Sequence, residues 1–127
     1  MKTPTQGRTG MKVTVLPGDG VGPEVTREAV KVLRVVCDLS GLDVGVTEAA
    51  VGGAAIRQCG RPLPQSTLDQ CLASDAVLLG AVGGPEFDAL PRPERPEAGL
   101  LDLRRALGGF ANLRPSRSYK TLMSASP

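Results

Sequence analysis

The sequence feature that most constrains the fold is the run DAVLLGAV at residues 75–82, which is apolar after its first residue. A strand with one solvent-facing side alternates apolar and polar residues, whereas a strand covered on both faces is apolar throughout. Turn residues follow at Gly83, Gly84 and Pro85. The run therefore predicts an inner strand of a parallel sheet that helices cover on both faces.

Strands and helices alternate on either side of this run. Apolar and β-branched residues predict further strands at residues 13–16, 44–51 and 110–113. Helical periodicity predicts helices at residues 23–39, 52–58, 67–73 and 98–107, the second of which is a short helical turn. This alternation predicts an α/β fold with right-handed crossover connections.

The helix at residues 23–39 has the clearest pattern. Pro23 suits its first turn, and Glu24 lies where the positive end of the helix dipole favours a carboxylate. Gly41 marks its end. We expect one apolar face to turn toward the core, made by Val25, Ala29, Val32, Val36 and Leu39.

Composition and charge exclude several classes of protein. The chain has 127 residues, with 15 Lys and Arg against 13 Asp and Glu interspersed along it, which argues against a nucleic-acid partner. Its apolar runs are too short to cross a bilayer, and residues 1–10 lack the apolar segment of a signal peptide. We expect residues 1–10 to be a disordered polar extension, residues 11–127 to hold the fold, and the protein to be cytoplasmic.

The residues that could bind a metal form no recognisable site. Cys37, Cys59 and Cys71 are widely spaced and the chain has no His, so free thiols are the better interpretation. The acidic residues form no spaced cluster of the kind that binds calcium. We therefore predict no metal ligand and assign no catalytic residue within this chain.

Two glycine-rich turns follow predicted strands, at residues 16–24 (LPGDGVGPE) and 80–85 (GAVGGP). Glycine lets a backbone approach a ligand closely, and ligands of open α/β sheets bind beyond the carboxyl ends of strands. The first turn departs from the dinucleotide fingerprint in its glycine spacing, so a tight turn without a ligand explains it equally well. The second also fits an ordinary strand-to-loop transition, although its place at a strand end favours binding.

A possible anion clamp lies near the end of the chain. Arg104 follows Leu100 by four residues and Leu101 by three, so the three side chains share a helix face. Arg114 follows the predicted strand at 110–113. Two arginine forks from neighbouring elements would orient a small branched dicarboxylate, although a single arginine is more often a solvated surface group.

Six segments in order carry a family resemblance. They are LPGDGVGPEV at 16–25, GGAAI at 52–56, PLP at 62–64, SDAVLLGAVGGP at 74–85, RPE with GLLDLR at 95–104, and ANLRP at 111–115. Together they resemble the amino-terminal part of the 3-isopropylmalate dehydrogenases, within the wider family of β-decarboxylating dehydrogenases. The resemblance covers residues 11–127 and implies an incomplete isopropylmalate-dehydrogenase-like α/β fold, truncated before its second half.

The resemblance also implies roles for particular residues. Arg104 and Arg114 would bind the malate carboxylates, while Leu100 and Leu101 would meet the isopropyl group. The nicotinamide side of NAD would be lined by Val21, Gly84, Pro85, Glu86 and Glu97.

The implied activity is the oxidative decarboxylation of 3-isopropylmalate to 2-oxoisocaproate in leucine biosynthesis, with NAD and Mg²⁺ or Mn²⁺, by a homodimer. In the family, a third substrate arginine, the catalytic Tyr and Lys and the metal-binding aspartates lie in a later part of the sequence without a counterpart here. We therefore expect this chain to be inactive alone, and poorly soluble, partly folded or self-associated. The alternatives are a sister enzyme acting on isocitrate, tartrate or homoisocitrate, and a non-enzymatic dicarboxylate-binding fragment.

Overall fold

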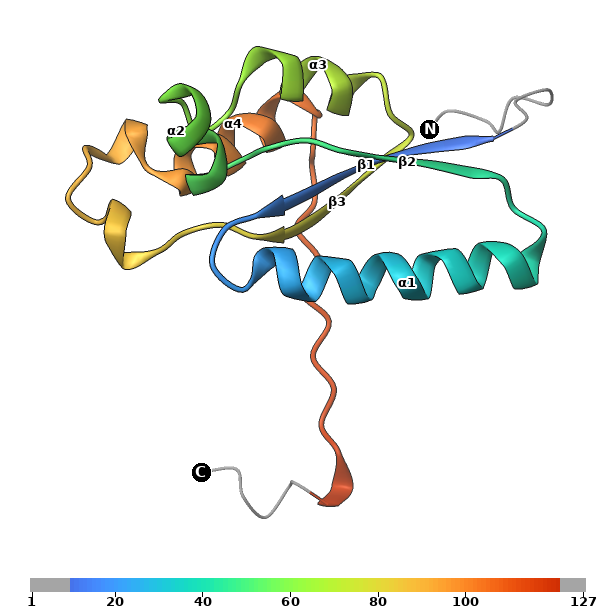
Figure 1. Ribbon diagram of the computed structural model, residues 1–127. Coiled ribbons are helices and arrows are strands. Elements are labelled where there is room, and N and C mark those ends of the chain that lie inside the picture. The colour runs from blue at the N-terminus through green and yellow to red at the C-terminus, as the bar shows by residue number, and fades with distance from the viewer. Residues whose placement is uncertain (1–9, 122–127) are drawn as a thin grey trace.

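The computed structural model describes residues 10–121 and contains a parallel sheet between two layers of helices (Figure 1). Helix α1 lies on one face of the sheet, and α2, α3 and α4 lie on the other. The predicted α/β fold is confirmed. The predicted extension at residues 1–10 falls outside the described residues except for Gly10. The elements are β1 (Met11–Gly18), α1 (Gly22–Ser40), β2 (Val44–Glu48), α2 (Gly53–Cys59), α3 (Gln65–Leu72), β3 (Ala76–Ala81), the 3-10 helices η1 (Pro85–Phe87) and η2 (Arg92–Glu94), and α4 (Pro96–Ala106).

Strand β1 is the centre of the sheet, whose order is β2-β1-β3 with both pairs parallel. Val13 is in register with Val46 on one side and with Ala76 on the other. At the carboxyl end of the sheet, Gly18 of β1 lies opposite Ala81 of β3. The loops that leave these two strands therefore meet at the same edge, although they are far apart in the sequence.

The core joins the sheet to the layer formed by α2, α3 and α4. Its buried cluster consists of Leu16, Val51, Cys71 and Leu103, which come from β1, the segment before α2, α3 and α4. Leu16 and Val51 are completely buried. Because aromatic residues make up only 2% of the sequence, this core depends on aliphatic side chains from many segments.

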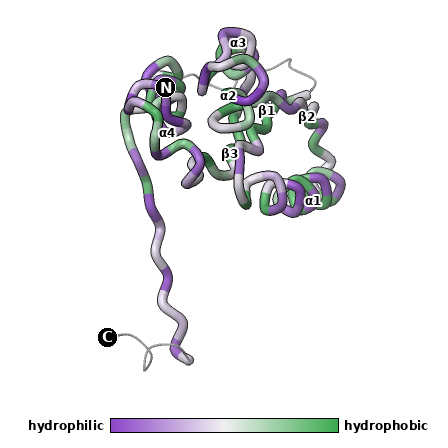
Figure 2. Tube along the Cα trace, turned by 60° about the vertical axis from the view of Figure 1, so that its left-hand side comes forward, coloured by the Kyte–Doolittle hydropathy of each residue, from purple (hydrophilic) through white to green (hydrophobic). Residues whose placement is uncertain are grey.

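Helix α1 forms where the sequence predicts it and ends at Gly41, whose φ of 65° is the left-handed cap conformation. Its buried face differs from the prediction, because Thr26 and Cys37 are buried while Val32 and Leu39 are 64% and 84% exposed. Figure 2 shows hydrophobic and hydrophilic residues around this helix. The predicted apolar face instead borders an open apolar groove of about 470 Å³ between α1 and the β1–β3 side of the sheet.

The predicted strand at residues 110–113 is wrong. Residues 107–119 form neither helix nor strand, and the chain extends away from the folded body after α4 (Figure 1). Phe110 and Leu113 are 101% and 87% exposed. A strand needs a neighbour to pair its backbone groups, and within residues 10–121 the sheet contains only β2, β1 and β3.

Three smaller differences concern strand coverage and loops. The strand predicted at 44–51 ends at Glu48, because Val51 turns into the core. Strand β3 is half-buried along most of its length rather than covered on both faces. Residues 86–95, for which the sequence predicts neither helix nor strand, contain η2 and part of η1.

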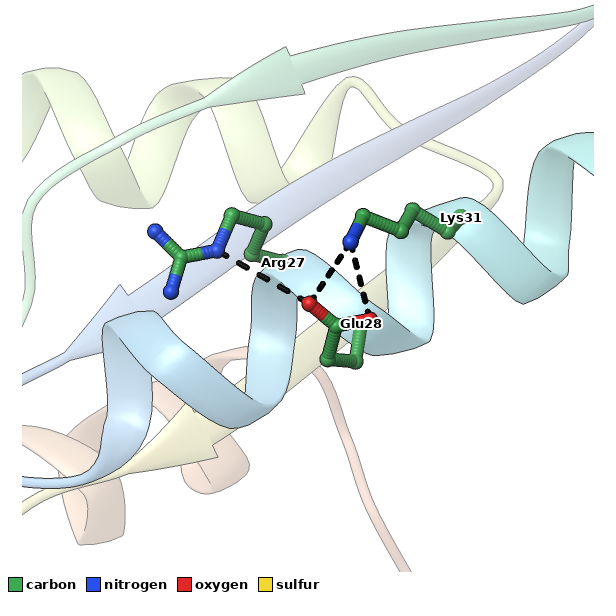
Figure 3. Close-up of polar contacts among 3 residues, drawn as sticks. All are labelled: Arg27, Glu28 and Lys31. Carbon is green, nitrogen blue, oxygen red and sulfur yellow. Dashed lines mark hydrogen bonds and ion pairs between the residues drawn. The ribbon is translucent and has the colours of Figure 1, made fainter.

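Exposed ion pairs lie on the outer surface of α1 (Figure 3). Lys31 Nζ donates hydrogen bonds to both Glu28 carboxylate oxygens, at 2.8 and 3.0 Å, and Arg27 Nε lies 3.9 Å from Oε1. The Lys31 hydrogen bond, supported by the positive charges of Lys31 and Arg27, lowers the pKa of the Glu28 carboxyl. Such exposed pairs contribute little to stability. Within the described residues, no helix is long and apolar enough to span a bilayer.

Candidate active site edge

The turn after β1 is packed against β3 through bare backbone. Asp19 N–H donates to Ala81 O at 2.9 Å. A Cβ added at Gly18 would lie 1.8 Å from that same carbonyl oxygen, and one added at Gly22 would lie 2.1 Å from Pro17 O. Real Cβ atoms do not approach so closely, so these two glycines are explained by close contact between chain segments. Contact with a ligand is not needed to account for them.

The carboxylate of Asp19 is the feature of this edge that sequence reasoning missed. Its side chain is buried, and its two oxygens accept hydrogen bonds from different segments. Oδ2 accepts from Gly53 N–H at 2.5 Å, and Oδ1 accepts from Gly83 N–H at 2.8 Å. These donors lie 34 and 64 residues away in the sequence, so only the glycine-flanked position of Asp19 could have drawn attention to it.

The residues predicted to line the nicotinamide are distributed around the loops that follow β1 and β3. Val21 follows the β1 turn and is 57% exposed. Gly84 and Pro85 follow Gly83, and a Cβ added at Gly83 would lie 2.6 Å from Glu97 Oε1. These residues thus lie on two loops that meet at one edge of the sheet and on the start of α4. Their contact with the nicotinamide of NAD stays a prediction.

The other predicted residue of this group, Glu86, is engaged with α2. Its carboxylate forms an exposed ion pair with Arg57 Nη1. The Arg57 guanidinium also lies 5.7 Å from the centroid of the Phe87 ring, and that ring packs over Gly53. These contacts attach the loop after β3 to α2.

Helix α4 carries three of the four predicted substrate-binding residues. Leu103 faces the core, and Gly99 packs so closely on the connector before α3 that an added Cβ would lie 2.7 Å from Pro62 O. Leu101 and Arg104 lie on the exposed part of the helix, while Leu100 is half-buried. The helix thus separates a packing face from a face that is open to solvent.

The structure does not bring Arg104 and Arg114 together in neighbouring elements. Arg114 lies in the irregular segment after α4 and is exposed. The clamp expected from a helix and the strand following it is therefore not assembled in the described residues, since that strand is absent. The substrate role of Arg114 stays a prediction.

Neither the pocket beside this edge nor a metal-binding cluster in the described residues includes any of the predicted site residues. A pocket of about 290 Å³ at the carboxyl ends of β1 and β2 is lined by Pro17, Gly18, Glu48, Ala49, Ala50, Ala54 and Gln58. It lies beside the edge described above and contains none of the predicted site residues. In the part of the chain that the structure covers, no three His, Cys, Asp or Glu side chains come together as a metal site.

Comparison with solved structures relates this arrangement to dehydrogenases. A β-decarboxylating dehydrogenase from Thermococcus kodakarensis superposes with a TM-score of 0.61 at 36% identity, over 77% of this chain and 27% of that one. An isocitrate dehydrogenase from Methylococcus capsulatus gives a TM-score of 0.53 at 32% identity, over 77% of this chain and 26% of the other. These likenesses place the fold among dehydrogenases of this type.

The sequence relatives are more nearly identical to this chain than these two solved structures are. A 3-isopropylmalate dehydrogenase from Moorella thermoacetica is 59% identical over 117 residues, which cover 91% of this chain and 33% of the relative. One from Heyndrickxia coagulans is 56% identical over 117 residues, covering 92% and 32% respectively. The chain thus spans about a third of the length of these relatives. The sequence profile of the isocitrate/isopropylmalate dehydrogenase family matches residues 12–127, and the chain belongs to that family.

Proposed function

We propose that this chain supplies the amino-terminal part of an NAD-dependent 3-isopropylmalate dehydrogenase. The observation that carries the proposal is the identity of 56% and 59% to relatives of that name across nearly the whole chain. The overall reaction moves a hydride from C2 of 3-isopropylmalate to NAD⁺, removes the hydroxyl proton, releases the carboxylate on C3 as CO₂, and protonates C3 to give 2-oxoisocaproate, with no net release of a proton. In this proposal the reaction belongs to leucine biosynthesis.

In this proposal, helix α4 presents the substrate-binding side chains. Arg104 binds a malate carboxylate, and Leu100 and Leu101 contact the isopropyl group. The exposure of Leu101 and Arg104, three residues apart on α4, supports this assignment. Arg114 supplies a second guanidinium once the segment after α4 folds back toward the helix.

The loops after β1 and β3 line the nicotinamide side of NAD in this proposal. Val21, Gly84 and Pro85 make the contacts with the ring, and Glu86 and Glu97 border it. NAD⁺ supplies the hydride acceptor when bound, and the chain's own residues orient the ring. Mg²⁺ or Mn²⁺ and the catalytic Tyr and Lys are assigned to the two thirds of the relatives' length that this chain does not match. The complete assembly is proposed to be a cytoplasmic homodimer.

The proposal is tested by a chimera. Residues 11–127 replace the matched segment of the Moorella thermoacetica relative, and the chimera is expressed in a leucine auxotroph that lacks the enzyme. We expect growth without leucine, and purified chimera that forms NADH from NAD⁺ with 3-isopropylmalate and Mg²⁺. A folded chimera that does not oxidise 3-isopropylmalate would refute the proposal.

A matched pair of arginines tests the substrate role. Arg104→Ala in the chimera should raise the KM for 3-isopropylmalate by at least about tenfold, because a charged hydrogen bond to a carboxylate is lost. Arg105→Ala is the control, since Arg105 Nη1 instead lies 3.0 Å from Asp102 Oδ1 on the exposed surface. Equal effects of the two substitutions would contradict the assignment.

A sister β-decarboxylating dehydrogenase is the second candidate function, favoured by the structural likeness to an isocitrate dehydrogenase. The chimera separates the two, because an apolar contact from Leu100 and Leu101 benefits only a substrate with an apolar branch. A larger kcat/KM for isocitrate, tartrate or homoisocitrate than for 3-isopropylmalate would support this candidate instead.

A further inference from the structure

We propose that Asp19 is a positioning residue for the cofactor side of the site. This inference rests on the proposed function, which places the nicotinamide beside Val21 and Gly84. The carboxylate of Asp19 joins the turn after β1 to the loop after β3 and to the first turn of α2. It thereby sets how far apart the two loops that border the ring are held.

The hydrogen bonds of Asp19 carry the first step of the argument. Its two oxygens divide between two donors, Gly53 N–H at 2.5 Å and Gly83 N–H at 2.8 Å. The residue is only 3% exposed. A buried carboxylate is costly unless it is hydrogen-bonded, so the two amides are held where the carboxylate requires them.

The second step is the absence of room around the carboxylate. A Cβ added at Gly53 would lie 2.9 Å from Asp19 Oδ2 and 2.2 Å from the Phe87 ring, and one added at Gly52 would lie 2.8 Å from the same oxygen. The segment that carries Gly52 and Gly53 therefore reaches Asp19 only as bare backbone. A longer acid at this position would meet that backbone, so Asp fits where Glu does not.

The third step connects this cluster to the proposed cofactor site. Gly83 N–H donates a hydrogen bond to Asp19, and Gly83 directly precedes Gly84 and Pro85. Its φ of 113° is a conformation that other residues rarely adopt, which makes the chain direction at this point specific. Val21 lies two residues after Asp19, in the turn between β1 and α1. A shift in either hydrogen bond therefore moves the surface that the ring would contact.

Asp19→Asn tests the inference with little change in shape. An amide keeps one acceptor but places a donor opposite the second backbone N–H, so one of the two hydrogen bonds is lost. Hydrogen exchange at single amides, measured by NMR on the chimera, should show protection at Gly53 and Gly83 that falls at least about tenfold at one of them in the variant. Asp88→Asn, at an exposed carboxylate in the loop after η1, is the matched control and should change neither amide.

The chimera provides the readout that a purely structural role would not change. Asp19→Asn should raise the KM for NAD⁺ by about tenfold and leave the KM for 3-isopropylmalate within about twofold, because the substrate side chains are on α4. Unchanged exchange at both glycines, or no protection in the unsubstituted chimera, would overturn the hydrogen-bonding step. Changed exchange with equal effects on both KM values would overturn the positioning role. An inactive unsubstituted chimera would refute the proposed function, and the cofactor role of Asp19 with it, while the exchange result would stand separately.

Discussion

Helix α4 offers two leucines, two residues apart, whose truncation should have opposite consequences. Leu103 is 2% exposed and belongs to the cluster with Leu16 and Cys71, whereas Leu101 is 51% exposed. Leu103→Ala removes buried methyl groups and leaves a cavity, which costs about 2–5 kcal/mol. Leu101→Ala loses roughly half the burial of one side chain, or about 1 kcal/mol. A domain of this size has a total stability of only about 5–15 kcal/mol.

Urea denaturation of the chimera, followed by circular dichroism, measures this difference. We expect the unfolding midpoint to fall about three times farther for Leu103→Ala than for Leu101→Ala, at similar m-values. In the chimera the order reverses for substrate binding, with Leu101→Ala raising the KM for 3-isopropylmalate about tenfold. Equal losses of stability would show that α4 does not pack through Leu103. The reasoning about its two faces would then be wrong.

Two further substitutions test packing and burial. Gly99→Ala should lower the free energy of unfolding by about 1 kcal/mol. Overpacking against Pro62 destabilises the variant by more than the gain of about 1 kcal/mol in helix propensity stabilises it. A more stable variant in urea denaturation would contradict this packing. Burial raises the pKa of the Cys71 thiol above its usual 9.0. The unfolded chain therefore loses this proton first, so stability should fall as the pH rises past that value, and Cys71→Ala should flatten the decline. Identical pH profiles of the urea midpoint for the two chains would contradict this explanation.

The sequence was most informative where structure depends on local pattern. The helix starting near Pro23 and ending at Gly41 and the strand at 75–82 were both found, because periodicity, caps and apolar runs are local signals. The orientation of α1 was not found. Its apolar residues form one broad face, and which part of that face is buried depends on how far the sheet extends beneath the helix. Burial along α1 follows Thr26 and Cys37 rather than the expected valines.

The role of Asp19 could not be predicted for a related reason. A carboxylate flanked by two glycines indicates a turn, but nothing local identifies a donor 34 residues away and another 64 residues away. These donors meet Asp19 only because β1 pairs with β3 in one register and because the segment before α2 returns across the sheet. The glycine-rich turn at residues 16–24, which the sequence indicates as a possible ligand site, is thus explained in large part by contacts within the chain.

The expected pairing of Arg104 with Arg114 also depends on contacts between distant segments. Here the sequence predicted a contact that the described residues do not make. The prediction required residues 110–113 to be a strand, and a strand is stable only when a neighbour pairs its backbone. Within residues 10–121, β3 ends the sheet and its far side has no further strand. Arg104 is fixed by a helix whose hydrogen bonds are internal, whereas the position of Arg114 depends on contacts outside its own segment. The first half of the proposed clamp therefore follows from local sequence, and the second half follows only from whatever packs against residues 107–119.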